Sequence, residues 1–532
     1  MAQDRRAPSL LALLALVLVV AIACAAAATD AHSDVVERLS VRPLPAARQA
    51  LALFQFSVDA PEDSTEAALV PSALRQLLTA ADAEALRLSF ALGRWSDARY
   101  GSAQALDGSG DAHAPFGANL QVILRPGDDV AERWRAATAE LGALFSASLG
   151  QLDNTVVAGL SDGDSGNETL VLDGGLAREE LCTENLTPWL AMLPCRSRAG
   201  LGRLLDPTRL LSSEYLALQL SVERSASTGR VKLRQLLTVV QPVGSLPSPS
   251  LADLFIDASS EEGDSSSPLS ACPLATESSI HVVPLDGSPL PAVDLKKTPV
   301  ALTDPVASAS WWKQDASSFV GRDVVSAHRF VTGYGQFRGG IAVQLTNAHP
   351  RCAVRVRYQD SLPWFLRLYG SSLRVASVND AVLEQSTFVP AELRGRPNEL
   401  AVELLLPANG SAVVSVEFDK AFIRLSEHPP DANRGFDVAP GVAQFEVVVN
   451  DDNSESQGEC ATLHREQRGR FSATQFTEPL LVPLPTPDFS MPYNVITMTS
   501  TVVAFFVGSM LNSLLRKAPR LQQLVRDGQT RA

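Results

Sequence analysis

The amino-acid sequence predicts a mainly β protein, with an antiparallel β-sandwich lumenal region, a few helices and one C-terminal transmembrane helix. Three observations lead to this prediction. Short runs of β-branched and other apolar residues recur between Pro, Gly, Asn and Asp, as in antiparallel sandwiches. Only two stretches carry the i, i+3, i+4 apolar spacing of a helix. One apolar segment near the C-terminus is long enough to cross a bilayer.

The N-terminus has the features of a secretory signal. Arg5 and Arg6 precede an apolar run that ends in a series of alanines, so residues 1–28 are predicted to be a signal peptide. The alternative, an uncleaved anchor, also delivers the chain to the secretory pathway.

Residues 29–243 are predicted to form an N-terminal lumenal unit of mixed α/β structure. Helical spacing covers residues 72–89 and 130–149. Strand patterns cover residues 51–58, 86–92, 120–125 and 231–243.

Residues 244–270 are rich in Ser, Pro and acidic side chains, and this composition predicts a solvated linker. Residues 271–494 then form a predicted C-terminal lumenal β-sandwich unit with a membrane-proximal collar. Its strand patterns cover residues 279–285, 341–347, 353–359, 400–406 and 411–418.

Residues 495–515 form the predicted transmembrane helix. Arg516, Lys517 and Arg520 follow it at once, and such positive flanks stay in the cytosol. Residues 516–532 are therefore a cytosolic tail, and the topology is single-pass type I with the bulk of the chain lumenal.

The cysteine count is informative for a lumenal chain. Of six cysteines, Cys24 leaves with the signal, so five remain in an oxidising compartment. Because five is odd, at least one should pair with another chain or stay free. The absence of CxxC spacing disfavours a zinc or thiol-redox site. Three sequons are candidate N-glycosylation sites: Asn167, Asn185 and Asn409.

The sequence offers little support for chemistry of its own. A net charge of −14 without a Lys/Arg-rich block argues against a nucleic-acid partner. The seven histidines show no HExxH spacing, and there is no GxSxG or phosphate-binding glycine motif. We expect no catalytic residue, no metal site and no cofactor. A glycan hydrolase with two facing carboxylates stays open as a minor alternative.

Several long, unusual strings resemble one known family, the phosphatidylinositol-glycan class T subunits of the glycosylphosphatidylinositol (GPI) transamidase complex. The strings are CTENLTPWLAMLPC from Cys182, CPLATESSIHV from Cys272, RFVTGYGQFRGG from Arg329, LPWFLRLYG from Leu362 and TEPLLVPLPTPDFSMPYNV from Thr477. Weaker similarities are LSFALGRWSDARYG and LFSASLGQLD. The resemblance covers nearly the whole mature chain.

The resemblance implies a non-catalytic scaffold subunit of an endoplasmic-reticulum membrane complex that attaches GPI anchors to proproteins. The catalytic cysteine and histidine of such a complex lie in a different, caspase-like subunit. Expected partners are therefore that subunit, other membrane subunits and the GPI lipid, with contact to the proprotein left open. The alternative from a different class is a free-standing type I receptor or adhesion ectodomain.

The resemblance also assigns roles to the cysteines. It places an interchain disulfide to the catalytic subunit at Cys182, which agrees with the odd count. With Cys182 joined to another chain, one pairing of the other four is Cys195 with Cys272 and Cys352 with Cys460, and the connectivity stays open at this point. An internal bridge between Cys182 and Cys195 is the alternative.

Four polar residues are implied to contact the GPI lipid: Asn433, Asp488, Ser490 and Asn494. A carboxylate can pair with an ethanolamine ammonium, and hydroxyl and amide groups can bond sugar hydroxyls. The alternative is that the last three cap the transmembrane helix, since such residues satisfy free backbone amides at a helix N-terminus.

Overall fold

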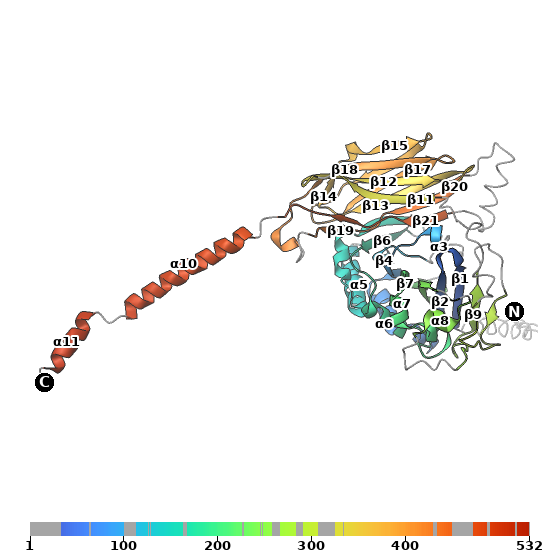
Figure 1. Cartoon of the computed structure of the whole chain (residues 1–532), viewed down its shortest axis with the longest axis horizontal. Coiled ribbons are helices and arrows are strands. Elements are labelled where there is room, and N and C mark those ends of the chain that lie inside the picture. The colour runs from blue at the N-terminus through green and yellow to red at the C-terminus, as the bar shows by residue number, and fades with distance from the viewer. Residues whose placement is uncertain are drawn as a thin grey trace, which may run out of the picture. The chain divides into compact units, whose positions relative to one another are not determined.

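The computed structural model describes residues 33–62, 65–100, 113–125, 127, 129–162, 168–225, 228–244, 246, 248–257, 267–283, 291–306, 325–333, 335–428, 434–448, 472–486, 490–515 and 519–530. The chain divides into a large unit, residues 1–421 and 436–482, and a small unit, residues 422–435 and 483–532. Strands dominate the large unit, and the small unit contains two helices (Figure 1).

The first part of the large unit is a ten-stranded sheet with the order β10-β9-β1-β2-β8-β7-β3-β4-β6-β5. Every neighbouring pair is antiparallel except β1 and β9, which are parallel. The strands are β1 (Asp34–Leu44), β2 (Gln49–Pro61), β3 (Ala83–Leu92), β4 (Gly117–Leu124), β5 (Val157–Asp162), β6 (Glu168–Leu176), β7 (Tyr215–Ser225), β8 (Arg230–Pro242), β9 (Glu277–Val282) and β10 (Val293–Asp294).

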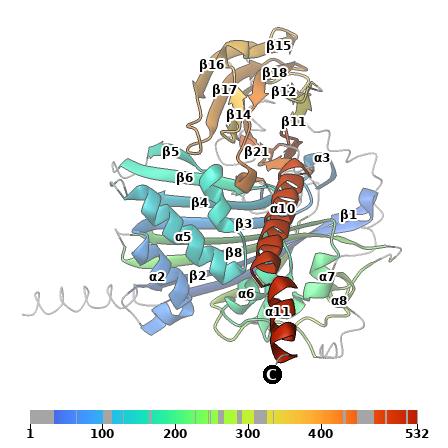
Figure 2. The ribbon, with the colours of Figure 1, turned by 90° about the vertical axis from the view of Figure 1, so that its left-hand side faces the viewer.

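Helices cover one face of this sheet, and α2 and α5 cross it in Figure 2. The helices on this face are α2 (Ser72–Ala80), α5 (Val130–Phe145), α6 (Thr183–Ala191), α7 (Pro207–Leu211) and α8 (Leu251–Phe255). Helix α3 (Asp97–Tyr100) belongs to the opposite face, where Tyr100 packs in a second apolar cluster with Leu51, Leu53 and Tyr215. Short 3₁₀ turns complete the connections, at Pro45–Ala47, Thr65–Leu69, Leu149–Asn154 and Gly200–Leu204.

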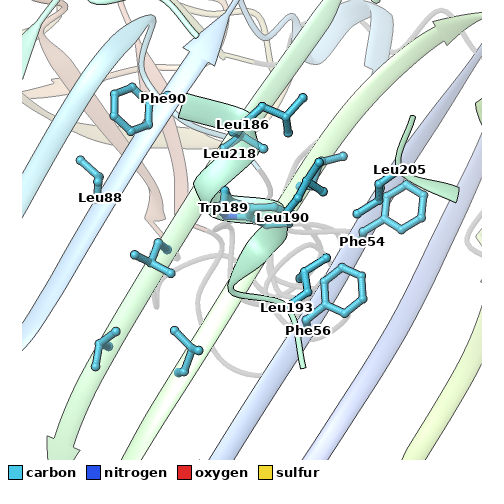
Figure 3. Packing of buried hydrophobic residues seen from close by; sticks show 14 of the residues in the cluster. Phe54, Phe56, Leu88, Phe90, Leu186, Trp189, Leu190, Leu193, Leu205 and Leu218 are labelled. Atoms are coloured by element: carbon cyan, nitrogen blue, oxygen red, sulfur yellow. The ribbon is translucent and has the colours of Figure 1, made fainter. Parts of the chain in front are cut away.

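The main core lies between the helices and the sheet. Trp189 of α6 is fully buried, and its ring contacts Phe56 at 6.3 Å between centroids (Figure 3). Along β4, Leu120, Val122 and Leu124 are buried in this core, while the intervening residues belong to the opposite face. The period of two therefore separates an apolar face under the helices from a polar face.

The first helix prediction was wrong in its second half. Helix α2 ends at Ala80, because Asp82 adopts a left-handed φ of 45° and turns the chain into β3. From there Leu86, Leu88 and Phe90 alternate into the core, so strand periodicity wins over the helical spacing. The second predicted helix is confirmed as α5.

The predicted linker is more ordered than its composition indicates. Within residues 244–270, Ser250 caps α8, and its Oγ accepts the Asp253 amide hydrogen at 3.2 Å. Phe255 is buried and contacts Phe54 at 5.1 Å between ring centroids. This part of the segment belongs to the core, and residues 258–266 lie outside the described residues.

The sheet topology also shows that the boundary predicted at residue 271 is too early in the chain. Strands β9 and β10, which follow it, extend the ten-stranded sheet. The β-sandwich starts only at β11, after Asp294, because the parallel pairing of β9 with β1 holds this segment on the first sheet.

The second part of the large unit is a β-sandwich of two antiparallel sheets. One sheet has the path β11-β12-β18-β14, with β15 also paired to β18, and the other has the order β16-β17-β13-β20-β21. The strands are β11 (Val325–Thr332), β12 (Arg338–Asn347), β13 (Ala353–Leu362), β14 (Leu366–Leu368), β15 (Arg374–Val378), β16 (Val382–Val389), β17 (Asn398–Leu406), β18 (Ser411–Lys420), β20 (Val442–Val448) and β21 (Ser472–Phe476). A separate pair joins β19 (Phe436–Val438) to β22 (Leu480–Val482).

The small unit carries α10 (Ser490–Leu515) and α11 (Pro519–Gln529). Within α10, the 23 residues Tyr493–Leu515 are long and apolar enough to cross a membrane. At 1.5 Å per residue they extend about 34 Å, which exceeds the ~30 Å hydrocarbon core. The predicted fold class, mainly β with one C-terminal transmembrane helix, is confirmed. The predicted signal peptide, residues 1–28, lies outside the described residues.

Candidate functional site

Cys182 lies at the N-terminal cap of α6, with an exposed side chain that forms no disulfide. Its carbonyl oxygen accepts the first helical hydrogen bond, from Leu186 N at 3.1 Å. Its backbone amide donates to Asn185 Oδ1 at 3.1 Å, and its thiol lies 3.3 Å from the same oxygen. The cap thus fixes the backbone of the cysteine and leaves the thiol at the surface.

Asn185 connects two helices and is only 1% exposed. Its Nδ2 atom donates to the carbonyl oxygen of Phe145 at 2.8 Å, at the end of α5. An N-linked glycan is attached through that same nitrogen, and a buried amide leaves no room for it. The structure therefore contradicts the predicted glycan at Asn185.

The other two sequons differ in position. Asn409 is exposed in the turn between β17 and β18, with a left-handed φ of 52°, and it stays a predicted glycosylation site. Asn167 lies outside the described residues.

The structure pairs Cys195 with Cys272, with 5.9 Å between their Cα atoms. This confirms the predicted pairing of these two cysteines and rules out the alternative bridge between Cys182 and Cys195. Cys352 is also disulfide-bonded. Its predicted partner, Cys460, lies outside the described residues.

The predicted collar consists of the four residues expected to contact the lipid: Asn433, Asp488, Ser490 and Asn494. The structure describes only part of it. Asn433 and Asp488 lie outside the described residues. Ser490 begins α10, and Asn494 follows one turn later with an exposed side chain. Whether they contact a lipid stays a prediction.

The two strands that adjoin the collar residues in sequence pair with each other. Strands β19 and β22 are antiparallel, and Phe436 pairs with Val482. Asn433 precedes Phe436 by three residues, and Asp488 follows Val482 by six.

Arg329 connects the β19–β22 strand pair to the sandwich. Its side chain is fully buried, and Nη1 donates to Asp360 Oδ1 at 2.6 Å. Its Nε and Nη2 donate to the carbonyl oxygen of Glu478 at 3.1 and 2.9 Å. Nη2 also donates to the carbonyl oxygens of Val438 and Ala439. One guanidinium thus binds the backbone just after β19 and just before β22.

Glu478 extends the same network to the ten-stranded sheet. Its carboxylate accepts from Arg329 N at 2.7 Å, pairs with His328 Nδ1 at 2.9 Å, and accepts from Arg94 Nη1 at 2.5 Å. Arg94 follows β3 of the large sheet. Burial acts to raise the pKa of Glu478, but these hydrogen bonds and the Arg94 charge outweigh it and leave that pKa below its ordinary value.

Comparison with known proteins decides the family. The signature described as "Gpi16 subunit, GPI transamidase component" matches residues 17–260 and 295–531. The chain belongs to the Gpi16 family. The "GPI-anchor transamidase component PIGT" of Mus musculus is 34% identical over 538 residues, which cover 90% of this chain and 89% of that protein. The protein of the same name from Homo sapiens is 33% identical, with 90% of each chain covered. The "GPI transamidase component GPI16" of Saccharomyces cerevisiae is 26% identical and covers 89% of this chain and 84% of its own.

Membership of the Gpi16 family confirms the resemblance carried by the quoted strings. Three of those strings, the ones containing Arg94, Arg329 and Glu478, meet in one hydrogen-bonded network. Sequence reasoning missed this network, because its members lie up to 384 positions apart. Their only signal was that each belongs to a string quoted for the family. Among the described residues, no group of three or more His, Cys, Asp or Glu side chains is placed to hold a metal ion.

Proposed function

We propose that this chain is a non-catalytic scaffold subunit of a GPI transamidase complex in the endoplasmic-reticulum membrane. It is disulfide-linked through Cys182 to the catalytic, cysteine-protease-like subunit. It contacts the GPI lipid through Asn433, Asp488, Ser490 and Asn494. The family membership supports the complex, since three relatives are named as components of a transamidase.

The exposed thiol of Cys182 is the observation that carries the proposal. The other lumenal cysteines within the described residues, Cys195, Cys272 and Cys352, are all oxidised. In an oxidising compartment, a surface cysteine on a rigid helix cap is suited to pair with another chain. A disulfide between subunits restricts their separated state, so it secures an interface that other contacts create.

The collar supplies the lipid-binding part of the proposal. A GPI head group combines a glycan with phosphoethanolamine and is held at the leaflet surface by its lipid tails. Asp488 pairs with the ethanolamine ammonium, and Ser490, Asn494 and Asn433 bond glycan hydroxyls. The start of α10 lies at the depth of the head group when the helix spans the bilayer.

The Arg329 network supports the same proposal from the lumenal side. Because Phe436 and Val482 pair, both collar segments start from one place. Arg329 and Glu478 connect that place to the sandwich and to the large sheet. A scaffold subunit needs this kind of connection to hold a lipid head group at a constant position relative to its partners.

The test is a GPI-anchored reporter expressed in cells that depend on this chain. We expect Asp488→Ala to lower surface reporter by about tenfold, as for the loss of a charge-assisted hydrogen bond. The complex should still co-purify with the variant. Gln385→Ala, an exposed amide on β16, is the matched control and should leave the reporter unchanged. Normal reporter attachment in Asp488→Ala would remove the lipid contact from the proposal.

A further inference from the structure

A second candidate site lies inside the large unit, in a cleft of about 720 Å³ that is lined by both polar and apolar side chains. Its floor is the face of the ten-stranded sheet away from the helices, formed by β3, β4, β6, β7 and β8. Its wall is formed by β13, β17, β20 and β21 of the sandwich. The volume falls within the roughly 300–1,000 Å³ of small-molecule sites.

The register of the strands places polar side chains side by side on the floor of the cleft. One cross-strand row joins five polar residues through successive backbone pairs: Asp173, Gln121, Arg87, Ser221 and Arg234. Each of the five has at least one strand neighbour in the apolar core under the helices: Leu172, Leu120, Leu86, Leu220 and Leu233, in the same order. Since a strand alternates its side chains between faces, this row is a continuous polar strip five strands wide.

The wall is held rigidly against the floor. Ser361 Oγ of β13 donates to the Thr155 carbonyl oxygen at 3.1 Å. His113 Nε2 lies 2.9 Å from the Thr474 carbonyl oxygen. A Cβ atom on Gly175 of β6 would lie 3.1 Å from the Ala439 side chain, so glycine allows the sandwich to approach closely. The cleft is therefore preformed between two connected β assemblies.

Side-chain amides dominate the hydrogen-bonding groups at one end of the floor. The Asp173 carboxylate accepts from Asn119 Nδ2 at 2.9 Å and from Gln121 Nε2 at 3.3 Å. Burial raises the pKa of Asp173 despite these two hydrogen bonds. The carboxylate orients both amides, and each keeps its oxygen and a second N–H for another partner.

The charges of the cleft compensate one another. Arg87 pairs with Glu223 at 3.0 Å, and Asp360 is neutralised by Arg329. Among the remaining charged residues that line the cleft, Lys232 and Arg234 are positive and Asp173 and Glu399 are negative, so their charges balance in number. A phosphate or a strongly cationic ligand therefore gains little here, and a neutral polar ligand fits best.

The floor also argues against an extended peptide. The backbone groups of a sheet face are used in its own ladders, so recognition must come from side chains. Amides both donate and accept, and so do sugar hydroxyls. Phe116 and Phe476 line the cleft with half-buried rings, which can cover the apolar C–H face of a sugar.

We propose that this cleft binds a neutral, hydroxyl-rich oligosaccharide. Such a glycan can come from a glycolipid head group or from an N-linked glycan of a protein. The site is separate from the collar and does not depend on the transamidase assignment.

The test uses the full chain in detergent and saturation-transfer NMR. The two probes are a lipid-free mannosyl-glucosamine oligosaccharide and an oligomannose N-glycan released from its protein. We expect transfer to at least one probe, and the probe that binds identifies the source. Ser221→Trp fills the floor and should abolish transfer, while Gln121→Ala should weaken binding by about tenfold.

Gln344→Ala is the matched control, because it removes an exposed amide on the sandwich away from the cleft. It should bind the probe as the unaltered chain does. Thermal unfolding of each variant separates loss of binding from loss of the fold. No transfer to either probe with the unaltered, folded chain would overturn the proposal, and so would equal transfer with folded Ser221→Trp.

Discussion

Cys182 and Asn185 form a helix cap in which one residue is exposed and the other is buried. The Cys182 amide donates to Asn185 Oδ1 at 3.1 Å, and Asn185 Nδ2 donates to Phe145 O at 2.8 Å. One amide side chain thus satisfies the start of α6 and the end of α5. The thiol that we propose to link two subunits is held by a residue that belongs to the core.

Replacing Asn185 should destabilise the chain. Asn185→Ala leaves the Cys182 amide and the Phe145 carbonyl without their partner, at a cost of about 1–3 kcal/mol. Thermal unfolding of the solubilised protein measures this cost. Thr187→Ala is the control, since it breaks the same sequon but removes only an exposed hydroxyl. Equal unfolding temperatures for the two variants would contradict the cap.

Glycan occupancy should follow exposure. Asn409→Gln should reduce the mass shift seen on endoglycosidase treatment, because Asn409 is exposed in a turn. Thr187→Ala should leave that shift unchanged, because buried Asn185 carries no glycan. A smaller shift in Thr187→Ala would show that Asn185 is modified and that its burial is wrong.

The Arg329–Asp360 pair should behave as a buried ion pair. Both side chains are at most 1% exposed. Arg329→Met should cost about 3–5 kcal/mol, since it leaves the Asp360 charge buried without its partner. Arg329→Met with Asp360→Leu should recover the part of this loss that comes from the unpaired Asp360 charge, while the carbonyl oxygens of Val438, Ala439 and Glu478 still lack their donor. Measured unfolding energies that are equal in the single and the double variant would contradict this account.

Glu478 should make stability depend on acidic pH. Its pKa is lowered in the folded chain, so its contribution is present above the unfolded value of ~4.3 and is lost as pH falls through the folded pKa. The unfolding temperature should therefore exceed that of Glu478→Gln at neutral pH, and the difference should shrink below about pH 4. A difference that is constant down to strongly acidic pH would contradict the assignment.

Local patterns predicted most of the β structure. The strands at 51–58, 341–347 and 400–406 lie within β2, β12 and β17, because short apolar, β-prone runs bounded by turn residues are typical of strands, whether one face or both are buried. The helix at 72–89 and the linker at 244–270 were partly wrong. There, contacts distant in sequence, such as Phe255 with Phe54, decide the structure, and composition does not contain them.

The sequence likewise predicted one part of the candidate site and missed another. Without Cys24 of the predicted signal peptide the number of cysteines is odd, so at least one should pair with another chain or stay free, and the family strings point to Cys182. No local signal pairs Arg94 with Glu478 or brings the polar faces of five strands under the sandwich. Those relationships follow only from sheet order and register.

The most direct test of the central claim is non-reducing electrophoresis of the complex purified through this chain. We expect a band at the combined mass of this chain and a cysteine-protease-like chain, identified by mass spectrometry. That band should separate into two on reduction, and it should be missing from Cys182→Ser while the two chains still co-purify. A single band at the mass of this chain alone, in both the unaltered protein and the variant, would contradict the covalent link.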